Sequence, residues 1–196
     1  ILPAFEMKIR TFALAAAVGL MPAALLAGDD PRTHLFILSG QSNMAALKPE
    51  SSFTPAVTRA FANDKVLVVK DAKSGQPIRR WYKQWKPAEN VGTPATRPKA
   101  DGLLFESLMK AVRGKIGDTK PDTVTLVWMQ GERDAKEGPA SATVYAASLK
   151  GLIAQLSEAL DRDDINFVIG RLSDHLKTGD WGTVRKAQEE LAATRP

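Results

Sequence analysis

The segment Phe36-Ile-Leu-Ser-Gly-Gln-Ser-Asn-Met44 joins an apolar run to a cluster of small polar residues. This change predicts a short buried strand over residues 35–38 that ends in a tight turn. In such a turn a hydroxyl projects beyond the sheet and backbone N–H groups point toward it, so Ser42 is a candidate nucleophile. Taken alone, the same residues also fit an ordinary loop between a strand and a helix.

Three further segments are apolar, rich in β-branched residues and short enough to be buried strands. They cover residues 65–69, 123–129 and 165–170. Apolar side chains recur at steps of three and four over residues 103–116 and 142–160, which predicts two helices. A last helix is expected to begin near Asp180, a favourable N-cap residue.

Strands that alternate with helices predict a parallel sheet with helices on both faces, a three-layer α/β/α sandwich. We expect one domain over residues 28–196. Ligands bind such sheets at the carboxyl ends of the strands. Three of the predicted strands end in polar turns, at residues 40–43, 130–134 and 171–175, and we expect these turns to meet at one edge. Three solvated loops are the alternative.

The N-terminal residues predict export. Met7 is followed by Lys8 and Arg10, an apolar run, and small residues up to Ala27, the pattern of a secretory signal peptide cleaved after Ala27. An uncut membrane anchor is the alternative, although Pro22 interrupts the run. No later apolar run is long enough to span a bilayer, so we expect no membrane association after cleavage. The chain has no cysteine, which excludes disulfides and a thiolate nucleophile, and fits a secreted or periplasmic bacterial protein.

Two motifs together resemble a known superfamily. They are Gly40-Gln-Ser-Asn-Met44 and Trp128-Met-Gln-Gly-Glu132, and they resemble SGNH hydrolases, with the sialate O-acetylesterase and family-6 carbohydrate esterase group as the nearest branch. An ordinary G-x-S-x-G elbow is excluded because Met44 replaces the second glycine. Further stretches at residues 75–82, 170–174 and 181–185 look like a bacterial branch of this group. The resemblance implies an SGNH, flavodoxin-like fold.

The resemblance also implies roles for single residues. Ser42 would attack an acyl carbon, and its backbone N–H would be one donor of an oxyanion hole. Gly102 would supply a second backbone N–H, and the Gln130 side chain the third donor. Alternatives remain open, because Gly102 could simply precede a helix and Gln130 could cap a loop. Glu132 would orient the catalytic histidine, or would pair with Arg80, Arg133 or Arg171.

The histidines depart from the family pattern. The family's base lies in an Asp-x-x-His motif, whereas this chain has only His34 and His175, and Lys177 stands where the motif would place the base. His34 precedes the first strand and should lie at the opposite end of the sheet from Ser42. We expect the base, the last strand and the last helix to lie beyond Pro196, and this chain alone to be nearly inactive.

The segment Arg79-Arg-Trp-Tyr-Lys-Gln-Trp85 interleaves cations with aromatic rings. Arg79, Arg80 and Trp81 are candidate contacts for a sugar substrate, because the resemblance places this segment near the mouth of the active site. A nucleic-acid patch is disfavoured, since the segment is short and the net charge is only +5. A surface loop with both tryptophans packed on the domain is the third interpretation.

These observations predict a serine esterase that removes O-acyl groups, most simply acetyl, from an acylated carbohydrate. No metal and no cofactor is expected, and no nucleic-acid partner. A non-catalytic carbohydrate-binding relative and a lipase-like or thioesterase-like SGNH hydrolase are the competing hypotheses.

Overall fold

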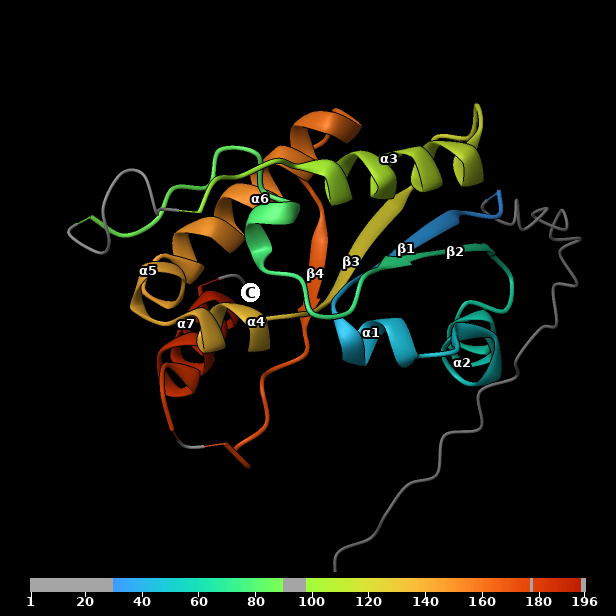
Figure 1. Cartoon of the computed structure of the whole chain (residues 1–196). Coiled ribbons are helices and arrows are strands. Elements are labelled where there is room, and N and C mark those ends of the chain that lie inside the picture. The colour runs from blue at the N-terminus through green and yellow to red at the C-terminus, as the bar shows by residue number, and fades with distance from the viewer. Residues whose placement is uncertain (1–29, 90–97, 177, 195–196) are drawn as a thin grey trace, which may run out of the picture. The chain divides into compact units, whose positions relative to one another are not determined.

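The computed structural model describes residues 30–89, 98–176 and 178–194 (Figure 1), and all of these except Asp30 belong to one compact unit. The predicted signal peptide lies outside the described residues and stays a prediction. No helix in the described part of the chain is both long and apolar enough to cross a bilayer.

Four parallel strands form one sheet in the order β2-β1-β3-β4. The predicted parallel sheet is therefore confirmed, and β3 has the bounds expected from its apolar run. Strands β1 and β2 extend beyond the predicted segments, and β4 is one residue shorter at each end. The strands are β1 (Thr33–Gly40), β2 (Lys65–Ala72), β3 (Thr123–Met129) and β4 (Asn166–Ile169).

The helices follow the apolar periodicity where it is strong. Helix α3 has the predicted bounds, and α6 ends at Leu160 as predicted but begins at Tyr145, three residues after the predicted start, because Ala142 belongs to the short helix α5. Helix α7 begins directly after Asp180, although the Asp180 side chain makes no capping hydrogen bond. The helices are α1 (Ser42–Ala46), α2 (Phe53–Ala60), α3 (Leu103–Ile116), α4 (Glu132–Glu137), α5 (Pro139–Ala142), α6 (Tyr145–Leu160) and α7 (Trp181–Ala193), with 3-10 turns η1 (Pro49–Ser51) and η2 (Ile78–Arg80).

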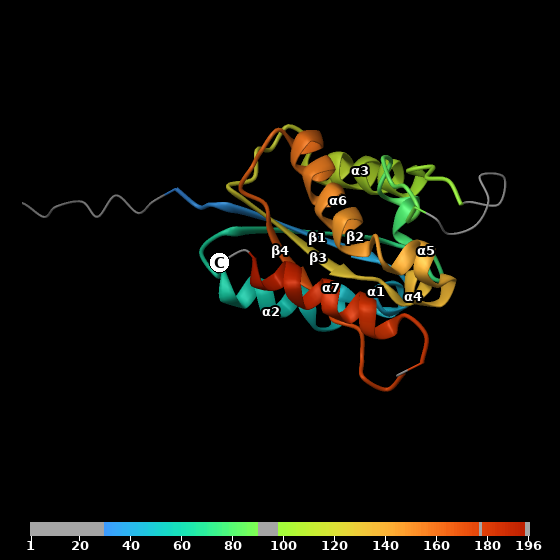
Figure 2. The ribbon, with the colours of Figure 1, turned by 90° about the vertical axis from the view of Figure 1, so that its left-hand side faces the viewer.

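Helices cover both faces of the sheet. Figure 2 shows α3 and α6 on one face, and α1, α2 and α7 on the other. The architecture is thus the predicted three-layer α/β/α sandwich. Its core contains apolar side chains from β1 and β3, including Ile37 and Trp128, packed against the inward faces of α3 and α6.

The strand register brings the ends of β1 and β3 together. Gly40, the last residue of β1, pairs with Ala72 of β2 and with Met129, the last residue of β3. Strand β4 lies beside β3 and runs in the same direction. The turns that follow β1, β3 and β4 therefore start from one edge of the sheet, where the candidate site lies.

Candidate active site

The turn that carries Ser42 is held against the end of β3. Gly40 has a φ of +139°, and a Cβ at this position would lie 2.1 Å from the carbonyl oxygen of Met129. The next residue, Gln41, donates its backbone N–H to the same oxygen at 2.8 Å. Ser42 then begins α1 with its side chain exposed. The structure thus places the candidate nucleophile at the predicted edge of the sheet.

Side chains from the neighbouring turns meet beside Ser42. Asn43 Nδ2 donates a hydrogen bond of 2.6 Å to Glu132 Oε1, which joins the turn after β1 to the turn after β3. A pocket of about 290 Å³ opens here, and residues from all three turns line it, including Asn43, Gln130, Glu132, Arg171 and His175. The expected meeting of the three polar turns is therefore confirmed.

Glu132 keeps one carboxylate oxygen free of protein partners. Its Oε2 is buried and has no hydrogen-bond partner among the described residues. The three arginines considered as partners all pair elsewhere: Arg80 with Asp101, Arg133 with Glu137, and Arg171 with Asp174 and Glu189. The Oε2 atom is therefore a buried acceptor that the described residues leave unsatisfied.

Gln41 is a site residue that the sequence interpretation missed. It is buried, and its Nε2 lies 3.5 Å from Ser42 Oγ. Its Oε1 accepts the backbone N–H of Arg133 at 3.1 Å. The side chain thus bridges the nucleophile turn and the first turn of α4. Its position between a strand end and the candidate nucleophile was the only available signal.

The Gln130 amide is fully buried, and its nitrogen faces protein acceptors. Nε2 lies 3.1 Å from the carbonyl oxygen of Gln76, 2.5 Å from Asp134 Oδ2 and 3.5 Å from Gln41 Oε1. Gln130 Oε1 has no partner among the described residues. An amide nitrogen has two hydrogens, so one of them is shared between acceptors. The role of Gln130 in an oxyanion hole stays a prediction.

Asp134 is a second residue that the sequence did not reveal. It is fully buried in α4, and its Oδ2 accepts the backbone N–H of Ile78 at 3.0 Å as well as the Gln130 amide. Burial raises the pKa of Asp134 to about 7, against the opposing effect of these hydrogen bonds. The sequence shows an acidic residue in a polar segment, which normally indicates exposure.

Gly102 immediately precedes α3 in the left-handed conformation, with a φ of +63°. A Cβ here would lie 2.4 Å from the Cγ of Lys83, so the backbone angle and this close approach both favour glycine at the position. No hydrogen bond among the described residues joins Gly102 to the Ser42 turn. Its oxyanion role stays a prediction.

The basic aromatic segment is largely tied to the protein. Trp81 is fully buried and packs edge-on against Trp128, with ring centroids 5.2 Å apart, so it has no surface for a sugar. Arg79 forms an ion pair with Glu137 and lies over Trp85, whose ring is also buried. Arg80 is about one third exposed and pairs with Asp101 at 2.9 Å. The interpretation in which both tryptophans pack on the domain fits this arrangement.

The two histidines have different surroundings. His34 is buried, with one ring nitrogen 2.7 Å from Thr123 Oγ1 and the other 2.9 Å from Asp64 Oδ2. It lies near the start of β1, at the opposite end of that strand from Ser42, as predicted. His175 is exposed and lines the same pocket as Glu132.

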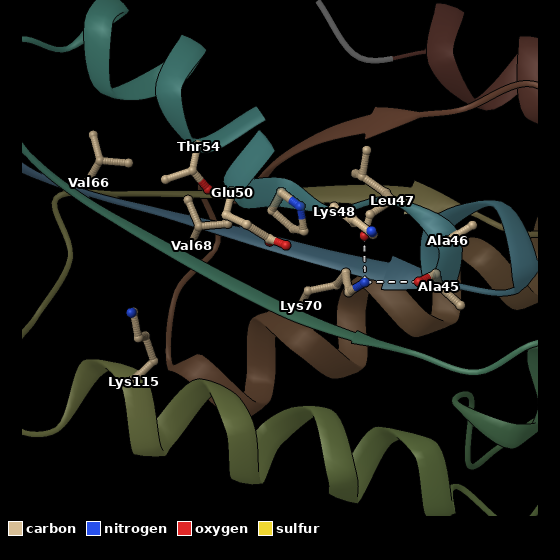
Figure 3. A pocket seen from close by; sticks show the side chains of 11 residues that line it. Ala45, Ala46, Leu47, Lys48, Glu50, Thr54, Val66, Val68, Lys70 and Lys115 are labelled. Carbon is tan, nitrogen blue, oxygen red and sulfur yellow. Dashed lines mark hydrogen bonds between the residues drawn. The ribbon is translucent and has the colours of Figure 1, made fainter. Parts of the chain in front are cut away.

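A larger pocket of about 700 Å³ lies between α1, η1, α2 and the edge strand β2 (Figure 3). Lys70 Nζ donates hydrogen bonds to the carbonyl oxygens of Ala45, at 3.0 Å, and Leu47, at 2.6 Å. These contacts tie the C-terminal end of α1 to β2. The pocket therefore adjoins the helix that begins at Ser42, but Ser42 does not line it.

No group of three or more histidine, aspartate or glutamate side chains in the described part of the chain is arranged to hold a metal ion. The side chains at this edge offer a serine hydroxyl, a carboxylate with one unsatisfied acceptor oxygen, and amides.

Comparisons with known proteins identify a family and a shared fold. A family model described as "Carbohydrate esterase, sialic acid-specific acetylesterase" matches residues 45–195. The match begins after Ser42, so it covers the Glu132 turn and the segment over residues 170–185 but not the nucleophile itself. No curated protein matches the sequence.

Two solved structures share the fold. A protein from Arabidopsis thaliana superposes with a TM-score of 0.60 at 19% identity, over 82% of this chain and 82% of that chain. A carbohydrate acetylesterase from Xanthomonas citri superposes with a TM-score of 0.53 at 16% identity, over 83% of this chain and 48% of that chain. This chain therefore spans about half the length of the Xanthomonas protein.

Proposed function

Because this chain belongs to the sialic acid-specific acetylesterase family of carbohydrate esterases, we propose that it hydrolyses O-acetyl esters of carbohydrates with Ser42 as the nucleophile. The observation that carries the proposal is the position of Ser42. Ser42 is exposed at the carboxyl edge of the sheet, and the next residue, Asn43, lines a pocket to which all three polar turns contribute. The Xanthomonas acetylesterase with the same fold supports the choice of ester.

The reaction would proceed in two acyl-transfer steps. Ser42 Oγ bonds to the acyl carbon while the bond from that carbon to the sugar oxygen breaks, and the sugar leaves with a proton. Water then attacks the acyl-serine, which releases acetate and restores the hydroxyl. The backbone N–H of Ser42 and the Gln130 amide would stabilise the oxyanion in both steps.

Glu132 would orient the histidine that acts as general base. Its Oε2 supports this role, since a buried carboxylate oxygen without a protein partner can accept an imidazole N–H. His175 lines the same pocket, but it does not stand in the Asp-x-x-His motif that the family resemblance implies. General-base assistance is worth roughly 10²–10⁴-fold in rate. We therefore expect slow turnover from the 196-residue chain by itself.

Hydrolysis of p-nitrophenyl acetate tests the proposal. We expect turnover that is slow but measurable, and that falls to the background rate in Ser42→Ala. The control Ser52→Ala changes an exposed serine outside the site and should keep the parent rate. Turnover that survives Ser42→Ala would overturn the assignment of the nucleophile.

The base requires a separate measurement. We expect His175→Ala to leave the slow rate within about threefold. A rapid parent rate that His175→Ala abolishes would identify His175 as the base and would contradict the expectation of slow turnover.

Of the three residues that the sequence suggested as substrate contacts, Trp81 is fully buried, and Arg80 is more exposed than Arg79. In an active preparation, we expect Arg80→Ala to reduce deacetylation of an acetylated polysaccharide by several-fold and to leave p-nitrophenyl acetate hydrolysis unchanged. Equal losses on both substrates would assign Arg80 a structural role through its pair with Asp101.

A further inference from the structure

Behind Ser42 lies a buried set of polar side chains, Gln41, Gln130 and Asp134, that connects the nucleophile turn to α4. All three are buried, and Gln130 and Asp134 are fully so. The contacts run from Asp134 Oδ2 to Gln130 Nε2, then to Gln41 Oε1, and from Gln41 Nε2 to Ser42 Oγ. Buried polar groups normally satisfy their hydrogen-bonding capacity, so the two oxygens left without partners require a physical reason.

The oxygens without a partner among the described residues are Gln130 Oε1 and Asp134 Oδ1. Turning the Gln130 amide over would place its oxygen against the Gln76 carbonyl and against Asp134, all of them acceptors. The observed orientation therefore leaves Oε1 unsatisfied in order to direct both N–H groups at acceptors. Asp134 and Gln76 together fix that orientation.

We propose that Asp134 is a positioning residue, whose carboxyl group holds one N–H of Gln130 so that the other N–H is directed toward the Gln41 and Ser42 turn. This inference rests on the proposed esterase function, because an acyl oxyanion would form beside Ser42. The second N–H is shared between the Gln76 carbonyl, at 3.1 Å, and Gln41 Oε1, at 3.5 Å. It is the less firmly held of the two and is the one that can turn to a substrate.

Asp134 is itself fixed from two sides. The backbone N–H of Ile78, from η2, donates to the same Oδ2 atom, and α4 carries Asp134 one helical turn after Gln130. The charged and titratable groups that act on it are Glu137 of α4, Arg79 of η2 and Tyr145 of α6. Glu137 and Arg79 form an ion pair with each other, so their effects on Asp134 oppose one another.

The side-chain amide of Gln130 reports the orientation directly by nuclear magnetic resonance, whether or not the chain is catalytically active. Its two proton signals, identified by their loss in Gln130→Met, should exchange slowly with solvent. They should also shift as Asp134 titrates near pH 7. Asp134→Asn retains one acceptor oxygen, so we expect slow exchange without the pH-dependent shift. Asp134→Leu removes the acceptor, and we expect exchange at least tenfold faster.

Ser148→Ala is the matched control, since it removes a buried hydroxyl that donates to Val144 within α6. It should leave the Gln130 signals unchanged. If Asp134→Leu does not fold, amide exchange in the wild type and in Asp134→Asn still tests the contact. Gln130 signals that exchange freely with solvent in the wild type, or that exchange no faster in a folded Asp134→Leu, would overturn the proposal.

Kinetics separate this inference from the proposed function. We expect Asp134→Leu to lower kcat for p-nitrophenyl acetate by roughly 10²-fold with little change in KM, as for loss of one oxyanion-hole donor. Turnover that Ser42→Ala abolishes but Asp134→Leu leaves unchanged would refute the positioning role alone. Amide signals that behave as expected in a protein without Ser42-dependent turnover would refute the esterase function alone.

Discussion

Gly40 places Ser42 at the edge of the sheet through a backbone angle that residues with a Cβ rarely adopt. Its φ is +139°, and the adjoining carbonyl of Met129 leaves no space for a side chain. The same carbonyl accepts the backbone N–H of Gln41. The close approach of Gly40 to Met129 therefore allows this hydrogen bond to form. One glycine thereby brings the ends of β1 and β3 into contact and sets the direction in which the chain leaves toward Ser42.

Gly40→Ala should lower the free energy of unfolding by at least about 3 kcal/mol, because backbone strain of about 1–3 kcal/mol adds to a clash that rigid backbone must relieve. Gly75→Ala is a matched control, since Gly75 has a φ of +70° but a methyl group there would have no atom within 4 Å. It should cost about 1–2 kcal/mol. Urea unfolding measures both, and equal losses would show that the Met129 contact is unimportant.

At the scale of elements, α1 depends on its surroundings, because five residues are too few for a stable isolated helix. Met44 anchors it in the core, and Lys70 of β2 donates to the carbonyl oxygens of Ala45 and Leu47 (Figure 3). Carbonyls at the end of a helix lack partners within the helix, and a cation is favourable there. Lys70 therefore stabilises the helix that begins with the nucleophile.

Lys70→Met should lower the free energy of unfolding by about 1–2 kcal/mol, since it leaves two carbonyl oxygens without their charged donor. It should also speed backbone amide exchange in α1. Lys115→Met is the control, because Lys115 lines the same pocket but donates to none of the residues drawn in Figure 3. Its effect should lie within about 0.5 kcal/mol. If both substitutions lowered the free energy of unfolding equally, the loss would come from removing a lysine charge and not from losing the contact with α1.

At the scale of the whole molecule, Gln130 is the point where several elements meet. Its backbone oxygen accepts hydrogen bonds from the Tyr145 hydroxyl of α6, at 2.8 Å, and from Gln188 Nε2 of α7, at 2.9 Å. Gln188 Oε1 in turn accepts the backbone N–H of Leu172, in the turn after β4. The buried polar network thus joins the three turns of the site to helices from both faces of the sheet.

The sequence predicted those parts of the fold that depend on apolar periodicity. The run Thr123–Met129 and the helix Leu103–Ile116 have the expected bounds, because burial on one side leaves a repeating pattern. Helix α4 was missed, since Glu132–Glu137 is polar and its two buried residues, Asp134 and Ala135, do not form an apolar stripe. Trp81 was assigned to substrate, whereas tertiary packing buries it against Trp128.

Only the candidate site residues that stand in recognisable sequence motifs were predicted. Ser42 and Glu132 were predicted as site residues because they stand in motifs that closely follow predicted strands, and their roles stay predictions. Gln41, Asp134 and Gln188 were not, because a buried polar side chain differs from an exposed one only through partners that are distant in the chain. Asp134 meets Ile78, and Gln188 meets Leu172, across segments that no local pattern connects.

Asp134 gives the whole molecule a specific dependence of stability on pH. Its pKa in the folded protein is about 7, above the ordinary value of 3.8. Between pH 4 and pH 7 the folded protein therefore retains a proton that the unfolded chain releases. The free energy of unfolding should consequently fall as pH rises through this window and level off above it, by up to about 4 kcal/mol.

Asp134→Asn cannot titrate, so its stability should lack this fall, and the difference between wild type and variant should change by a few kcal/mol from pH 4.5 to pH 8. Carboxyl groups with lowered pKa values, such as Asp64 beside His34, lose their contribution only at lower pH and are common to both proteins. Urea unfolding at a series of pH values measures the difference. If the free energies of unfolding of the two proteins changed with pH in parallel, Asp134 would be ionised in the folded protein at every pH measured. Its carboxylate would then be stabilised by interactions beyond the Ile78 and Gln130 hydrogen bonds.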